Sequence, residues 1–175
     1  MLDVPRERVG EAVARLDELG LPAYPSPFWR GAMACTGMQF CKLALVETKQ
    51  RAAGLVRALE RRFPDFDAKV RLNVNGCPNS CARYQVSDVG LAGGESAGDG
   101  NFQLHLGGDL GEARAFGQRV RSRVGAEEAE GVVGHLLSSY LAEREDGESL
   151  QSWLRQRTAE QLAELSRPRV PAGTG

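Results

Sequence analysis

The chain has 175 residues, of which 42% are hydrophobic and 26% are charged, and its formal net charge is −1 at pH 7. This length allows one compact domain and at most a small second one, and the composition is ordinary for a soluble globular protein. The near-neutral charge argues against general binding to nucleic acid or to an anionic membrane, because both require a basic excess.

The first twenty-two residues carry one predicted helix and no targeting signal. Residues 1–10 lack the apolar stretch of a signal peptide, and no run reaches the roughly 18 apolar residues of a membrane span, so we expect a cytoplasmic protein. Asp3 and Pro5 suit the start of a helix and Gly20 its end. Its apolar residues recur at helical spacing and are Val9, Val13, Leu16 and Leu19. An irregular connector is predicted at Pro22, Pro25 and Pro27.

A long helix is predicted over residues 42–62, directly after the small-residue segment 31–41. Pro64 should end it, and Glu47 and Arg51 have the spacing of an ion pair on one of its faces. The apolar face consists of Leu43, Val46, Val56, Leu59 and Phe63. This helix should place Cys41 at its N-terminus, where free N–H groups and the helix dipole favour a thiolate.

Three strands are predicted in the middle of the chain. Residues 70–75 alternate between apolar and polar side chains, which is typical of a strand with one buried face. Residues 75–81, Asn-Gly-Cys-Pro-Asn-Ser-Cys, are rich in turn formers. Further strands are expected over 84–91 and 102–106, with a glycine-rich turn over 93–100 between them. These segments indicate a mostly antiparallel meander.

The remainder of the chain is predicted to be helical. A short helix should contain Ala113, Phe116 and Val120. A strong apolar stripe follows, formed by Val132, Val133, Leu136, Leu137, Tyr140 and Leu141. Ser149 should cap a last helix with apolar residues at Leu150, Trp153, Leu154, Leu162 and Leu165. Residues 167–175 are expected to form a disordered tail. The fold class is therefore α+β, a mostly antiparallel sheet with flanking helices.

Four cysteines form two pairs, C-x5-C and C-x3-C, which are separated by 35 residues; they are Cys35, Cys41, Cys77 and Cys81. Without an export signal, a disulfide framework is not expected. Two facing loops with two thiolates each can close a four-thiolate cage, and Gly76 allows backbone N–H groups to turn toward sulfur. Structural zinc sites usually have C-x2-C to C-x4-C knuckles, which only the second pair fits. The spacing favours an iron–sulfur cluster, while zinc and unliganded core cysteines remain open.

Three motifs carry a family resemblance. Residues 34–41, Ala-Cys-Thr-Gly-Met-Gln-Phe-Cys, followed by Glu-Thr-Lys at 47–49, resemble the first cluster motif of ferredoxin-dependent nitrite reductases. Residues 75–83, Asn-Gly-Cys-Pro-Asn-Ser-Cys-Ala-Arg, resemble the second motif of the siroheme nitrite and sulfite reductase family. Residues 103–108, Gln-Leu-His-Leu-Gly-Gly, are similar to a later segment of that family. The order of the motifs and the gap between them also agree.

This resemblance implies a cofactor set and a reaction. The four cysteines would hold a 4Fe-4S cluster, and Cys81 would also be the axial ligand of a siroheme iron. Ferredoxin or a similar donor would supply single electrons for an assimilatory six-electron reduction of nitrite to ammonia or of sulfite to sulfide. The pattern over residues 35–41 favours nitrite. The alternative is a truncated, non-catalytic iron–sulfur electron-transfer module or a gene remnant.

The family's chain is roughly three times longer, and the missing part determines the expected domains. Residues 1–22 would be the remnant of a ferredoxin-like half-domain, and residues 23–166 the domain that binds the 4Fe-4S cluster and siroheme. The resemblance places the basic residues that bind the substrate anion in the absent N-terminal part, so no catalytic residue is identified. The isolated chain is expected to be inactive, and a separately encoded N-terminal half is a possible partner.

Several other residues have ordinary structural interpretations. Lys42 and Arg83 flank the cysteine motifs and are expected at the surface. His105 and His135 are expected to be packed rather than metal ligands, and Trp153 to be a core or docking aromatic. A solvated helix face is favoured over a ferredoxin-binding face for the three arginines Arg119, Arg121 and Arg123.

Overall fold

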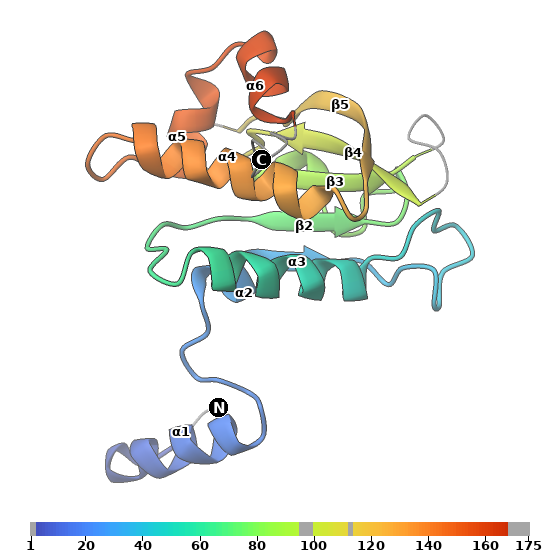
Figure 1. Ribbon diagram of the computed structural model, residues 1–175. Helices are drawn as coiled ribbons and strands as arrows, with labels where there is room; N and C mark the ends of the chain where they lie inside the picture. The colour runs from blue at the N-terminus through green and yellow to red at the C-terminus, as the bar shows by residue number, and fades with distance from the viewer. Residues whose placement is uncertain (1–2, 95–99, 112–113, 168–175) are drawn as a thin grey trace, which may run out of the picture.

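A computed structural model describes residues 3–94, 100–111 and 114–167 and confirms an α+β fold with helices flanking one sheet (Figure 1). The sheet has five strands in the order β1-β2-β3-β4-β5. The strands are β1 (Ala32–Ala34), β2 (Leu72–Asn75), β3 (Val89–Gly93), β4 (Asn101–Leu106) and β5 (Gln118–Gly125). None of the helices in the described ranges combines the length and the apolar character that crossing a bilayer requires.

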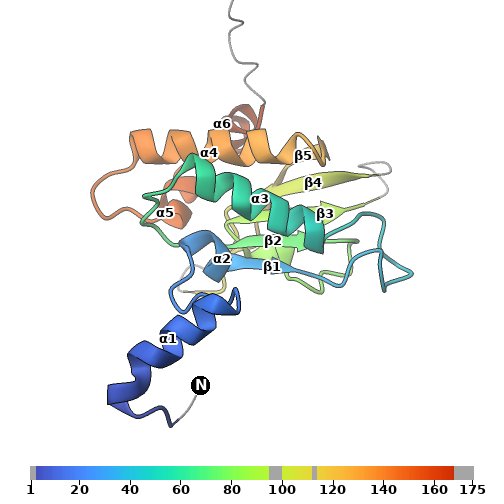
Figure 2. The same ribbon diagram turned by 60° about the horizontal axis from the view of Figure 1, so that its bottom comes forward.

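The N-terminal helix is confirmed as α1 (Val9–Glu18), which follows the 3-10 turn η1 (Arg6–Arg8). All ten of its residues, which the structure describes, are at least partly exposed. Figures 1 and 2 show α1 standing apart from the sheet at the end of an extended segment. The predicted irregular connector ends in a short helix, α2 (Pro27–Gly31), whose first turn is capped by the hydroxyl of Ser26.

The long helix is α3 (Lys49–Arg62), which begins later than the predicted position 42. The prediction that Cys41 lies at its N-terminus is therefore wrong. The segment before α3 is irregular because its backbone makes contacts outside any helix: the N–H of Leu45 donates to the carbonyl of Gly76 at 2.7 Å. Contact with a distant loop replaces the helical hydrogen bonds that the apolar spacing had suggested.

Glu47 and Arg51 do not form the predicted ion pair. The Glu47 carboxylate accepts hydrogen bonds from the backbone N–H groups of Gln50 and Arg51, at 3.0 and 3.2 Å. It thus satisfies two of the free N–H groups in the first turn of α3. The guanidinium of Arg51 instead pairs with Glu127.

The sheet is mixed rather than mostly antiparallel. β1 pairs with β2 and β2 with β3 in parallel, whereas the β3–β4 and β4–β5 pairs are antiparallel. β2 is buried at all four positions, so the expectation of one exposed face is wrong. The predicted strand over 84–91 divides into the 3-10 turn η2 (Tyr84–Val86) and β3.

Among the described residues, the C-terminal third contains one strand and three helices. The short helix expected near Val120 is wrong, because this segment is β5 and pairs with β4; Ala113 lies outside the described residues. α4 (Ala129–Glu143) confirms the apolar stripe. The predicted last helix is two helices, α5 (Leu150–Arg155) and α6 (Ala159–Leu165). Ser149 caps α5 as predicted, and a capping box at Thr158 starts α6. Of the expected tail, residues 168–175 lie outside the described ranges.

The core lies between the sheet and the layer formed by α3 and α4 (Figures 1 and 2). Burial alternates along β4, and Phe102, Leu104 and Leu106 join the core. Trp153 is 1% exposed and contacts Tyr140 edge-on at 5.7 Å, which confirms it as a core aromatic.

Candidate metal centre

Parallel pairing of β1 and β2 brings the two cysteine segments to one edge of the sheet. Cys35 follows the last residue of β1, and Cys77 comes shortly after the end of β2. The register pairs Ala34 with Val74, so both strands end at the same level. Because the carboxyl ends of parallel strands meet at one edge, residues 42 positions apart leave the sheet side by side.

Three hydrogen bonds join the two segments directly. The backbone N–H of Cys35 donates to the carbonyl of Val74 at 3.0 Å. The N–H of Gly76 donates to Cys35 Sγ at 3.1 Å, which confirms that this glycine turns a donor toward sulfur. Leu45 N–H and the Gly76 carbonyl form the third contact. An N–H group aimed at a sulfur stabilises the thiolate.

Thr48 anchors the first cysteine segment from the other side. This fully buried residue donates its hydroxyl to the Cys35 carbonyl at 2.7 Å. Gly37 has a φ of +76°, and a Cβ there would lie 2.5 Å from Thr48 Oγ1. The Gly37 carbonyl accepts the N–H of Cys41 at 3.0 Å. The segment between the first two cysteines is thus a tight turn held against the start of α3.

Two buried asparagines on β2 hold the second cysteine segment. Asn75 is 1% exposed. With its amide assigned so that every donor meets an acceptor, the side-chain oxygen accepts the N–H groups of Cys81 at 2.9 Å and Ala82 at 3.0 Å. Asn73 donates its side-chain N–H to the carbonyl of Arg83 at 3.0 Å. Arg83 has a φ of +53°, in the left-handed region. The alternation over residues 70–75 suggested solvent contact for both amides, so their role was missed.

The four thiols differ in exposure. Cys77 is buried, Cys35 and Cys41 are half-buried, and Cys81 is exposed. In the described ranges, no three Cys, His, Asp or Glu side chains are gathered closely enough to hold a metal ion. The structure therefore brings the two backbone segments together without forming a closed cage of thiols. The donor set still fits a cluster, because all four donors are thiols and one sulfur already accepts an N–H group.

A shallow hollow of about 460 Å³ lies beside Cys77. Its lining includes Leu43 and Leu45 from the first segment and Pro78 and Asn79 from the second. Leu43 is 63% exposed. The face next to the cysteines is therefore partly apolar and open.

The other residues considered from the sequence pack against neighbouring side chains or bond to them. Arg83 donates to Met33 Sδ at 3.8 Å. His105 packs edge-on against Tyr84 at 4.7 Å, and burial is the main cause that lowers the pKa of His105. Arg121 is partly buried, pairs with Glu128 at 2.6 Å and donates to the Ser166 carbonyl at 2.9 Å. Arg119, Arg121 and Arg123 all lie on a strand rather than on a helix face.

A polar cluster that the sequence did not reveal lies where β2 and β3 begin. Arg71 precedes β2, and its guanidinium bonds Asp88 at 2.8 Å and Asp109 at 3.0 Å. Both carboxylates are at least 95% buried, whereas the Arg71 side chain is 37% exposed. The hydrogen bond that the Arg71 guanidinium donates to Asp88 is the main cause that raises the pKa of Arg71. The cluster fastens the amino-terminal ends of these strands, away from the cysteine edge.

Comparison with known proteins agrees with this geometry. Residues 26–171 match the family described as nitrite and sulphite reductase 4Fe-4S domain. The chain is 44% identical over 172 residues to sulfite reductase (ferredoxin) 1 of Mycolicibacterium paratuberculosis, covering 93% of this chain and 31% of that protein. It is 39% identical over 117 residues to ferredoxin–nitrite reductase of Synechococcus elongatus, covering 65% of this chain and 23% of that protein.

Solved structures show the same fold. The Mycobacterium tuberculosis NirA protein superposes with a TM-score of 0.82 at 37% identity, over 92% of this chain and 31% of that one. Dissimilatory sulfite reductase I superposes with a TM-score of 0.71 at 13% identity, which shows a shared fold alone. The chain spans about a third of the length of curated relatives that it matches. It belongs to the nitrite and sulphite reductase 4Fe-4S domain family.

Proposed function

We propose that this chain is the cofactor-binding portion of a siroheme reductase that reduces nitrite or sulfite with electrons from ferredoxin. One observation carries the proposal: two parallel strands bring both cysteine segments to one sheet edge, where Gly76 N–H donates to Cys35 Sγ. Family membership and the names of the relatives support it.

In this proposal Cys35, Cys41, Cys77 and Cys81 hold a 4Fe-4S cluster, and Cys81 also binds the siroheme iron. When bound, the two groups supply single-electron transfer and an iron site at which the oxyanion is reduced. The exposure of Cys81 supports its second role, because a ligand shared with another group must be accessible. Asn75 fixes the backbone at Cys81 through two N–H groups, so it positions that sulfur.

The stoichiometry of the overall reaction determines how many electrons and protons the site must receive. Nitrite takes up six electrons and eight protons to give ammonium and two waters, and sulfite takes up six electrons and eight protons to give hydrogen sulfide and three waters. The motif over residues 35–41 supports nitrite, whereas identities of 44% and 42% to two proteins named sulfite reductase, against 39% to the nitrite reductase above, support sulfite. Protons and cations that assist cleavage of N–O or S–O bonds would come from the part of the relatives that this chain does not span.

A second candidate is an iron–sulfur electron-transfer module without catalysis. The observation that favours it is that both cysteine segments meet at one edge of the sheet, where a cluster used for electron transfer would be held. We also propose that residues 1–22 belong to a ferredoxin-like half-domain, and that catalysis requires the part of the relatives that this chain does not span; a separately encoded chain is one source of that part. The chain alone is then expected to reduce neither nitrite nor sulfite with a reduced viologen.

The proposal is tested by anaerobic reconstitution of the chain with iron, sulfide and siroheme. The expected absorption spectrum contains siroheme bands that are perturbed by the cluster. Cys81→Ser should remove this perturbation, whereas the matched surface variant Lys42→Ala should retain it. A preparation that takes up only zinc, or siroheme bands that are unchanged by Cys81→Ser, would contradict the proposal.

A further inference from the structure

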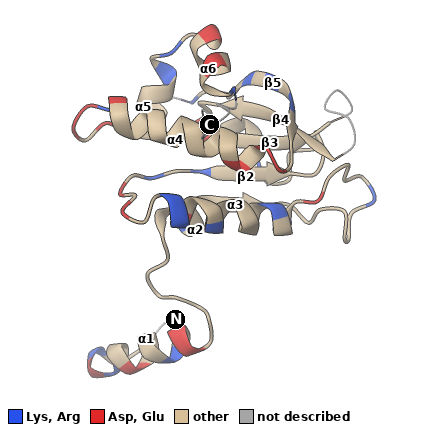
Figure 3. Cartoon of the chain, viewed as in Figure 1, with Lys and Arg blue, Asp and Glu red and all other residues tan. Residues whose placement is uncertain are grey.

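The exposed side of α3 is almost purely basic (Figure 3). The helix contains five basic residues and one acidic residue, although the whole chain has a net charge of −1. The acidic residue, Glu60, is half-buried and accepts the indole N–H of Trp29 at 3.0 Å. The exposed positions of the helix are Lys49, Gln50, Arg51, Gly54, Arg57, Arg61 and Arg62.

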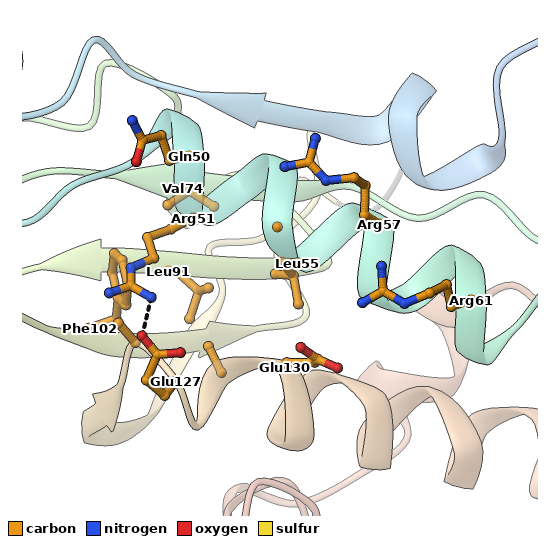
Figure 4. A pocket seen from close by; sticks show the side chains of 13 residues that line it. Gln50, Arg51, Leu55, Arg57, Arg61, Val74, Leu91, Phe102, Glu127 and Glu130 are labelled. Atoms are coloured by element: carbon orange, nitrogen blue, oxygen red, sulfur yellow. Dashed lines mark hydrogen bonds and ion pairs between the residues drawn. The ribbon is translucent and has the colours of Figure 1, made fainter.

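Arg57 and Arg61 are exposed cations on α3. They line a hollow of about 290 Å³ beside α3, with Glu127 and Glu130 on its far side (Figure 4). Glu127 pairs with Arg51. Within the described ranges, neither Arg57 nor Arg61 forms an ion pair. These two guanidinium groups are therefore available to an outside anion.

The position of Lys49 is unfavourable for the helix itself. A cation in the first turn opposes the helix dipole, and α3 has no acidic residue in that turn. The Lys49 ammonium lies 5.7 Å from the ring centroid of Phe40, a side chain that is 70% exposed. An exposed residue that lowers the stability of its own helix is expected where that residue serves binding, and Lys49 fits this description.

The basic face begins beside the candidate cluster. Lys49 directly follows Thr48, whose hydroxyl holds the Cys35 carbonyl. With a rise of about 1.5 Å per residue, the face extends about 18 Å from Lys49 to Arg61. A protein docked there would lie next to the segment that carries Cys35.

We propose that Lys49, Arg57 and Arg61 form a docking surface for an acidic single-electron carrier of the ferredoxin class. The inference rests on the proposed function, which requires such a donor close to the cluster. Charge complementarity identifies the occupant, because cations that have no ion-pair partner in the described ranges can steer and hold a partner of opposite charge. Arg121, considered from the sequence for this role, is occupied by Glu128.

The test is calorimetric titration of the chain with an acidic [2Fe–2S] ferredoxin at low and high salt. The double variant Arg57→Glu/Arg61→Glu should weaken binding about tenfold at low salt, and the difference should shrink at high salt as the charges are screened. Arg57→Gln/Arg61→Gln should have an intermediate effect. Arg155→Glu, an exposed arginine on α5, is the matched control and should change the affinity less than about twofold.

Thermal melting of each variant shows whether it is folded. If Arg57→Glu/Arg61→Glu does not fold, the test uses Arg57→Gln/Arg61→Gln instead. The inference is overturned if the unmodified chain does not bind ferredoxin at low salt, if the α3 variants bind as tightly as the unmodified chain, or if Arg155→Glu weakens binding equally. Because binding is measured without substrate turnover or siroheme, a failed reconstitution contradicts the proposed function and leaves this result standing. Loss of docking with a normal siroheme spectrum overturns the docking surface alone.

Discussion

Replacing Asn75 by alanine removes the acceptor that holds the second cysteine segment. The N–H of Ala82, a residue that is 1% exposed, would lose its partner in a buried place, which costs about 1–3 kcal/mol. The N–H of Cys81, an exposed residue, can turn to water and costs about 0.5–1.5 kcal/mol. Asn75→Ala should therefore lower the free energy of unfolding by about 1.5–4.5 kcal/mol.

Asn73→Ala is the matched control, since it deletes the same atoms from the same buried strand. It removes one donor to the Arg83 carbonyl and should cost only about 1 kcal/mol. Urea unfolding followed by circular dichroism measures both values. Losses that agree within about 0.5 kcal/mol would show that Asn75 has no special role in holding the segment.

Three further predictions concern the rest of the fold. Arg71→Met should lower the free energy of unfolding by about 2–3 kcal/mol, because Asp88 and Asp109 would remain buried without their cation; the estimate is below that for a fully buried pair because Arg71 is 37% exposed. A loss under about 0.5 kcal/mol in urea unfolding would contradict this role. Leu137→Ala should cost about 2–5 kcal/mol by opening a cavity at a fully buried position, and an unchanged thermal midpoint would argue against the described packing. Burial lowers the pKa of His105 below 6.5. On acidification the unfolded chain therefore takes up the His105 proton at a higher pH than the folded chain, and the free energy of unfolding should fall as the pH drops below about 6.5. His105→Gln should flatten that decline in urea midpoints measured between about pH 7.5 and pH 5.5, and an equal decline in both proteins would refute the assignment.

The elements that the sequence predicted correctly have a strong local signal. The stripe of α4 and the alternation of β4 each persist over their whole length, because one side of each faces the core. The cap at Ser149 is also local, since its hydroxyl accepts the N–H of Ser152 at 3.1 Å.

The errors occur where distant contacts decide the structure. Leu43 and Val46 fit a helical stripe, but the bond between Leu45 and Gly76 commits that segment to an irregular path. β5 is largely exposed, with only Val124 buried, so its strand form depends on pairing with β4 rather than on its own apolar pattern.

The cysteines of the candidate site could be predicted from the sequence, but the strand pairing and the side chains that hold the cysteine segments could not. The cysteine spacing needs only the sequence, whereas the meeting of the two segments depends on the parallel pairing of β1 and β2. Asn73 and Asn75 resemble solvent-facing residues in an alternating strand, and only burial of both faces of β2 reveals them as supports for the loop.

The most direct measurement is the iron and acid-labile sulfide content of the anaerobically reconstituted chain, with the four single Cys→Ala variants beside it. We predict about four irons and four sulfides per chain, and a clear loss of both in each variant. Zinc in place of iron, or variants of Cys35 and Cys77 that retain the full content, would contradict a cluster held between the two segments.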